Sequence, residues 1–173
     1  MSSASEPGTT PQGFVLDKDQ GDAFWWLGSL AINKLDGGST HGGLSIVESL
    51  VPAGYAPPVH IHSGKDETFY ILDGRFSFVC GSQSWQIGPG SLVFLPRDVP
   101  HGFRVSDDGP GRLLLIGNPA GFEDLIRELG DPAQQLQVPG PDVPMPDPDR
   151  VSAVWATHGI TIVAPGSTPT PTP

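Results

Sequence analysis

Two histidines and a glutamate lie close together in the sequence and constrain this chain more than any other feature. His60 and His62 are two positions apart. Side chains on a β-strand point to alternate faces, so both imidazoles should leave the same face. Residues 63–66 then allow a tight turn into a neighbouring strand that begins at Glu67. Two imidazoles and a carboxylate would meet at one point, as a divalent metal site requires. The competing interpretation is a chance polar cluster on a loop before a strand.

The most suitable fourth ligand is His101. It follows an apolar strand and a proline-bounded turn in residues 90–100, so it should open a new strand beside the old one. The chain has five histidines. Of the remaining two, His41 lies in a glycine-rich loop and His158 stands next to a glycine after a predicted helix. Both are interpreted as surface or capping residues.

The stretch around these ligands resembles the first cupin motif. That motif is a glycine, five residues, His-x-His, three or four residues, a glutamate, six residues and a second glycine. Its positions are all met here, by Gly54, His60, His62, Glu67 and Gly74.

The second cupin motif is matched in part, by Gly90, Pro96 and His101. Asp98 replaces a glycine of the motif, a change that costs little because aspartate tolerates turn and left-handed conformations. Val105 replaces an asparagine that does not bind metal. Neither departure removes a ligand.

The resemblance implies an all-β fold, namely the cupin double-stranded β-helix or jelly-roll barrel with a short C-terminal helical segment. The layout, including a start at Trp25-Trp26-Leu27-Gly28 and a helix over 120–130, is similar to small single-domain cupins related to bacterial quercetin 2,3-dioxygenase. No internal repeat is visible, so one cupin unit is expected.

Composition independently favours a β-rich domain, because 23 glycines and 20 prolines among 173 residues indicate many turns between short strands. We expect one cupin domain over 14–163, with C-terminal helices from about residue 120. Apolar spacing predicts a helix over 122–129. A second helix is expected over 149–156 and an edge strand over 161–163. Residues 1–13 and 164–173 are rich in small residues and proline and are expected to be disordered.

The sequence also suggests several local structures. Asp73-Gly74 predicts a hairpin between strands at 67–72 and 75–80. Residues 14–20 are expected to form a short strand and a turn, and residues 36–38 a turn.

Trp25 and Trp26 should point to opposite faces, so one can enter a pocket while the other covers an interface. Alternatively, both pack on a barrel or dimer surface. We expect a homodimer, from the family resemblance and because the apolar strands of 24–35 would otherwise stay unpaired.

Alternation also predicts the cavity lining. Glu67, Phe69 and Ile71 share one face of their strand, and Phe103 shares a face with His101. We therefore expect Phe69, Ile71 and Phe103 to bind substrate beyond the metal. Core packing is the alternative role for both phenylalanines.

Charge and cysteine content limit the partners. A net charge of −10 and a pI near 4.6 disfavour nucleic acid and anionic membrane surfaces. The one cysteine, Cys80, is predicted to be a buried, inert thiol, and no signal peptide or membrane-spanning stretch is visible. These features predict a cytoplasmic protein whose partner is a small molecule.

Three imidazoles and a carboxylate suit Fe, Mn, Co or Ni, while Cu and Zn also bind such sets. The resemblance implies a quercetinase-like dioxygenase, in which the metal holds an enol or phenol oxygen of an aromatic or polyketide-like substrate while dioxygen attacks the activated carbon. Glu67 would be the catalytic base, or else only a structural ligand. Alternatives are a metal-dependent isomerase, cyclase or decarboxylase, and a non-catalytic binding cupin.

Overall fold

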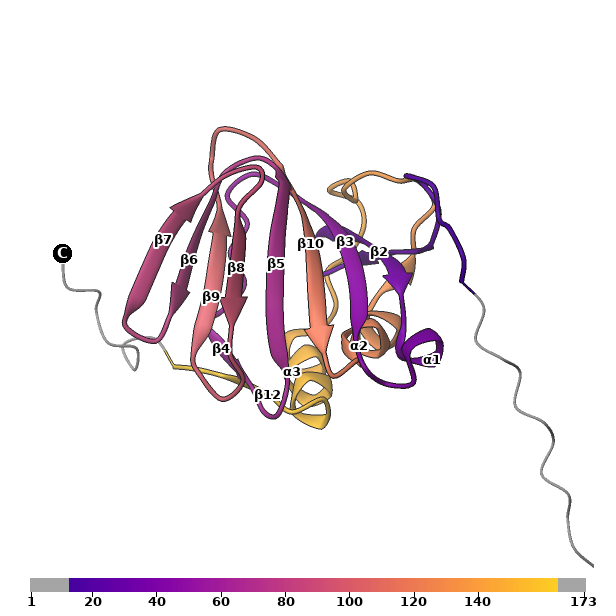
Figure 1. The fold of residues 1–173 in the computed structure, drawn as a ribbon. Coiled ribbons are helices and arrows are strands. Elements are labelled where there is room, and N and C mark those ends of the chain that lie inside the picture. The colour runs from indigo at the N-terminus through magenta and orange to yellow at the C-terminus, as the bar shows by residue number, and fades with distance from the viewer. Residues whose placement is uncertain (1–12, 165–173) are drawn as a thin grey trace, which may run out of the picture.

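The computed structural model describes residues 13–164, which form two antiparallel β-sheets that face one another (Figure 1). Neighbours in the seven-stranded sheet are, in order, β11 (Asp131–Pro132), β1 (Asp22–Trp26), β2 (Ser29–Leu35), β3 (Ser45–Val51), β10 (Gly111–Asn118), β5 (Asp66–Asp73) and β8 (Leu92–Leu95). The five-stranded sheet runs β12 (Ile160–Ile162), β4 (His60–His62), β9 (His101–Val105), β6 (Phe76–Cys80) and β7 (Gln83–Ile87). The all-β prediction is confirmed.

The hydrophobic core fills the space between the two sheets. Alternation holds along the central strands, where β10 reads buried and half-buried in turn. Phe69 from the larger sheet packs against Phe78 and Phe103 from the smaller one, with ring centroids 5.2 and 5.7 Å apart. These tilted aromatic pairs join the two sheets at the middle of the core.

The predicted hairpin at Asp73-Gly74 is wrong. Strand β5 pairs with β10 and β8, whereas β6 pairs with β7 and β9, so this turn carries the chain from one sheet to the other. Gly74 has φ +82°, and a Cβ there would lie 2.7 Å from Pro110 O. The glycine is therefore required by a crowded crossing at the edge of the sandwich.

The turns flanking the candidate ligands also cross between sheets. Residues 63–66 lead from β4 in the smaller sheet to β5 in the larger one, and the turn before His101 leads from β8 back to β9. Neither turn joins neighbouring strands of one sheet, contrary to the sequence-based expectation. Glu67 consequently faces the histidines across the interior.

Other local predictions are corrected near the N-terminal end. Residues 14–20 contain a turn but no strand, and residues 37–40 form the short helix α1 (Gly37–Thr40) rather than a simple turn. The strands of 24–35 are not left unpaired, because β11 and β3 flank β1 and β2. That part of the argument for a dimer does not hold.

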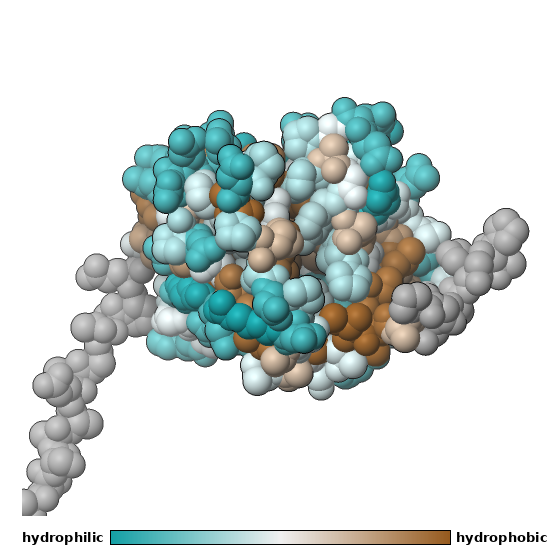
Figure 2. Space-filling view, turned by 180° about the vertical axis from the view of Figure 1, so that it is seen from behind, coloured by the Kyte–Doolittle hydropathy of each residue, from teal (hydrophilic) through white to brown (hydrophobic). Residues whose placement is uncertain are grey.

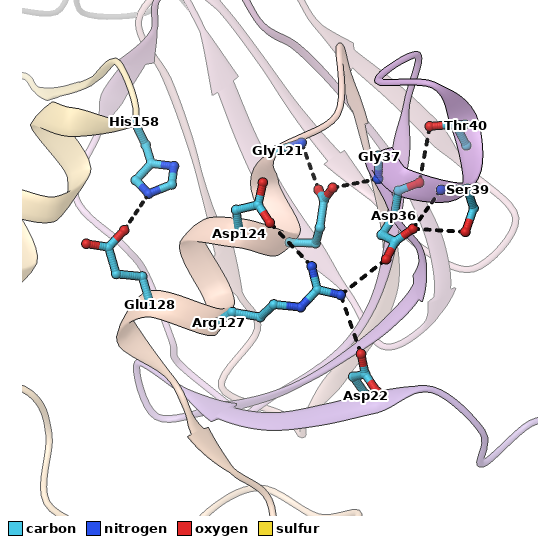
Figure 3. A network of polar contacts seen from close by, with 11 residues as sticks. Asp22, Asp36, Gly37, Ser39, Thr40, Gly121, Asp124, Arg127, Glu128 and His158 are labelled. Carbon is cyan, nitrogen blue, oxygen red and sulfur yellow. Dashed lines mark hydrogen bonds and ion pairs between the residues drawn. The ribbon is translucent and has the colours of Figure 1, made fainter. Parts of the chain in front are cut away.

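Two further helices lie at the end of the sandwich where β4 and β12 are found (Figure 1). Helix α2 (Phe122–Leu129) buries Leu125, Ile126 and Leu129, as the apolar spacing predicts. Helix α3 (Pro148–Thr157) follows the proline-rich segment and includes the expected range 149–156. Arg127 of α2 lies 3.3–3.4 Å from the carboxylates of Asp22, Asp36 and Asp124 (Figure 3). These exposed ion pairs connect α2 to β1 and to the cap of α1.

Seen from behind, the surface is mostly hydrophilic, with hydrophobic residues gathered toward one lower side (Figure 2). Among residues 13–164, no helix has the length and apolar character needed to span a bilayer. The segments 1–13 and 164–173 are predicted to be disordered. Except for Gly13 and Ala164, their residues lie outside the part of the chain that the structure describes.

Replacing Gly111 by alanine should destabilise the protein by about 1–3 kcal/mol, the usual cost of overpacking a core. A methyl group at this position would collide with the ring of Phe76, which is 1% exposed. Urea denaturation measures the effect. Gly109→Ala is the matched control, because nothing lies within 4 Å of its added methyl. Equal stability of the two variants would contradict this packing.

Candidate metal centre

Four side chains from three strands converge at one end of the interior. His60 and His62 come from β4, His101 from β9 and Glu67 from β5, and all four are buried. Their potential ligand atoms lie within 4.8 Å of one another. Glu67 Oε2 is 3.1 Å from His101 Nε2 and 3.5 Å from His62 Nε2. The structure thus brings together the four residues that the sequence proposed as ligands.

Backbone carbonyls orient two of the imidazoles. His60 Nδ1 lies 2.8 Å from Pro58 O, and His101 Nδ1 lies 2.9 Å from Val99 O. Because a carbonyl oxygen can only accept, each Nδ1 carries a hydrogen and donates a hydrogen bond to the carbonyl. In a neutral ring this leaves the lone pair on Nε2, the usual arrangement for a metal-ligating histidine, and His101 Nε2 is directed at Glu67 Oε2.

His62 provides the test of whether a metal fits. His62 is 2% exposed, and its buried Nε2 has no hydrogen-bond partner among residues 13–164. A buried polar atom without a partner is costly, and a metal ion would satisfy it. The donor set of imidazole nitrogens and one carboxylate suits a divalent transition metal.

Burial sets the protonation of the group. It lowers the pKa of His60 and brings the pKa of His62 down to about 4, because a buried imidazolium loses its hydration. Burial alone would raise the pKa of Glu67, but the adjacent His62 and His101 outweigh it and hold that pKa below its ordinary value. At neutral pH His60 and His62 are therefore unprotonated and Glu67 is ionised, as metal binding requires.

A mostly apolar cavity of about 60 Å³ adjoins the four side chains. Phe69 and Phe103 line it, as predicted, and both also pack in the core. Ile71 is fully buried in the core and is not part of the lining, so its predicted contact with substrate is not supported by the geometry. It lies four residues beyond Glu67 along β5, farther into the sandwich.

Comparisons with known proteins agree with the motifs. Residues 46–117 match the family model of the cupin domain. Residues 46–117 are a cupin domain.

The chain is 29% identical over 119 residues to quercetin 2,3-dioxygenase of Bacillus subtilis (strain 168), an alignment that covers 69% of this chain but only 35% of that protein. The chain therefore spans about a third of this curated relative.

Among solved structures, KdgF from Halomonas sp. aligns with a TM-score of 0.56 and 15% identity, covering 65% of this chain and 98% of that one. The polyketide cyclase RemF from Streptomyces resistomycificus aligns with a TM-score of 0.54 and 20% identity, covering 62% and 80%. At these identities the likeness shows the fold alone.

Asp98, one of the two residues that depart from the second cupin motif, has the conformation expected of it. Asp98 has φ +64°, the left-handed region in which glycine normally stands. Its N–H donates to His62 O at 2.9 Å. This loop of the cupin therefore fixes the strand that carries two of the candidate ligands.

The other two histidines have capping roles, as predicted. His41 ends α1 in a left-handed conformation, and His158 ends α3.

Sequence reasoning missed several residues of the cavity. These are Tyr55, Trp155 and Ile160. Trp26 also lines the cavity and Trp25 does not, in agreement with the interpretation that one of the two tryptophans enters a pocket. Tyr55 follows the first glycine of the motif, so its position was a usable signal. Trp155 and Ile160 come from α3 and β12, about ninety residues beyond the histidine pair, and nothing local to them points to the site.

When no metal is bound, the free energy of unfolding should decrease by on the order of 1 kcal/mol as the pH is lowered from about 7.5 to about 5.5. His62 has an ordinary pKa of 6.5 and a pKa of about 4 in the folded state, so the unfolded chain binds more protons in this window. Urea denaturation in a chelator measures the loss. His62→Asn should lose less, and an identical pH dependence in that variant would contradict the assignment.

Proposed function

We propose that this cupin is a metal-dependent enzyme in which His60, His62, Glu67 and His101 hold one divalent transition metal ion. The observation that carries the proposal is the buried His62 Nε2, which lacks a partner among the described residues and faces a carboxylate 3.5 Å away. Its best-supported activity is that of a dioxygenase acting on an enol- or phenol-bearing compound. The alignment with quercetin 2,3-dioxygenase, which covers 69% of this chain, supports that reaction.

When bound, the ion would act as a Lewis acid that lowers the pKa of a substrate hydroxyl. The protein supplies the rest of the site. Glu67 is ionised and buried, so its Oε2 can accept the hydroxyl proton. The His60 and His101 rings are held by backbone carbonyls, and apolar side chains such as Phe69 and Phe103 exclude water from the substrate.

A second candidate function keeps the metal and the base but uses no dioxygen. It is an isomerisation, cyclisation or decarboxylation of a small carbonyl compound. The volume of the cavity favours it, because about 60 Å³ is far below the roughly 300–1,000 Å³ of sites for drug-sized ligands. A three-ring flavonol would require the cavity to open.

Oxygen consumption separates the two functions. The protein is reconstituted with Fe, Mn, Co or Ni, analysed for metal, and tested against flavonols and small enols. The dioxygenase proposal expects uptake that needs both metal and substrate and that disappears in His62→Ala. Metal bound without uptake would favour the second function, and failure to bind any metal would leave a non-catalytic binding cupin.

Glu67→Gln should lower turnover by roughly 10²- to 10⁴-fold, the usual contribution of a general base, while most of the metal stays bound. Activity and metal content are measured on the same preparation. Glu48→Gln is the matched control, since Glu48 pairs with Lys34 and Arg112 on the outer face of the same sheet. Full activity in Glu67→Gln would reduce Glu67 to a structural ligand.

We also propose that the protein is a homodimer, as the family resemblance implies. The outer face of β5 and of the edge strand β8 exposes Tyr70, Leu72, Leu92 and Phe94, with Leu92 61% exposed. Such an apolar edge is a common pairing surface. Light scattering at micromolar concentration should give a dimer mass that falls in Phe94→Lys, and a monomer mass for the wild type would refute the proposal.

A further inference from the structure

Two tryptophans line the cavity beside the candidate metal centre. The aromatic ring of Trp155 lies 5.4 Å from the ring of His60, measured between ring centroids. Trp26 packs edge-on against Phe122 at 5.4 Å, and Phe122 lies 6.3 Å from His62. One indole therefore adjoins a candidate ligand directly, and the other is one ring away from a second ligand.

Both indole N–H groups are buried, and neither has an acceptor within the described part of the chain. Trp155 as a whole is 4% exposed. An unpaired buried donor is unfavourable, so two of them in the lining of one cavity suggest that acceptors arrive with a ligand. The other two tryptophans differ, because Trp25 Nε1 donates to Gln137 O at 3.0 Å and Trp85 is 36% exposed on β7.

The position of Trp155 is fixed before any ligand binds. At the end of α3, His158 Nε2 lies 2.8 Å from Glu128 Oε2 (Figure 3), and Arg150 Nη2 donates to Glu128 O at 3.1 Å. After α3, strand β12 pairs with β4, with Ile160 opposite His62. The C-terminal segment is thus attached to both α2 and the strand that carries two candidate ligands.

The geometry points to Trp155 and Trp26 as ligand-binding residues that donate their indole N–H groups to oxygen acceptors of a small oxygenated substrate. The acceptors belong to a compound such as a β-dicarbonyl in its enol form. An apolar body suits the lining of Phe69, Phe103 and Leu113, and a cavity of about 60 Å³ favours a compound much smaller than a three-ring flavonol. This inference rests on the proposed function, because the same compound would reach the metal with its enol oxygen.

Proton–nitrogen correlation NMR of the Zn²⁺-loaded protein tests the inference, since Zn²⁺ has no unpaired electrons. The chain has four tryptophans, so four indole N–H signals are followed while pentane-2,4-dione is added. The signals of Trp155 and Trp26 should move downfield and saturate, while those of Trp25 and Trp85 stay in place. The movement of the signals is measured on the wild-type protein. Tryptophan variants serve only to assign each signal to its residue.

Affinity provides a second readout. Trp155→Phe and Trp26→Phe should each weaken binding of pentane-2,4-dione by roughly 3- to 10-fold, the worth of one hydrogen bond. Trp25→Phe is the matched control and should leave the affinity unchanged.

The outcomes separate this inference from the proposed function. Failure to take up Zn²⁺ together with failure to take up Fe, Mn, Co and Ni contradicts the metal site and with it both proposals. Zn²⁺ uptake with unmoved Trp155 and Trp26 signals overturns the indole role alone. Binding of a flavonol but not of pentane-2,4-dione in the millimolar range overturns the small-substrate class.

Discussion

The meeting of one carboxylate with three imidazoles across the interior is the constraint on which this structure depends. Glu67 belongs to the larger sheet, and His60, His62 and His101 belong to the smaller one. Burying such polar groups is costly unless each finds a partner, and His62 Nε2 has none among the described residues. Turns that cross between the sheets bring Glu67 opposite the histidines, and carbonyls of Pro58 and Val99 hold two of the rings.

The C-terminal segment completes the site that the barrel begins. Helix α3 and strand β12 lie at the same end of the sandwich as β4 (Figure 1), and they contribute Trp155 and Ile160 to the cavity. Side chains of α3 and β12 help to line the cavity of about 60 Å³, and burial brings the pKa of His62 down to about 4. The size of the cavity therefore decides which substrates can reach the candidate metal ligands.

Local reasoning from the sequence succeeded where the answer is local. Strand alternation predicted that Glu67 and Phe69 share a face and that Phe103 accompanies His101, because side-chain parity needs no knowledge of the neighbouring strand. The left-handed conformation of Asp98 followed from the motif in the same way. Strand pairing is different, because Asp73-Gly74 has the same turn signature whether the next strand joins the same sheet or the opposite one. Trp155 was missed because its role arises from packing between segments far apart in the chain.

Extended X-ray absorption of the Co²⁺-reconstituted protein, measured together with its cobalt content, tests the central claim most directly. The four-ligand site should hold one ion per chain, with scattering from several imidazole rings that decreases in His62→Ala. Cobalt surrounded only by oxygen, or an imidazole signal unchanged in His62→Ala, would contradict it.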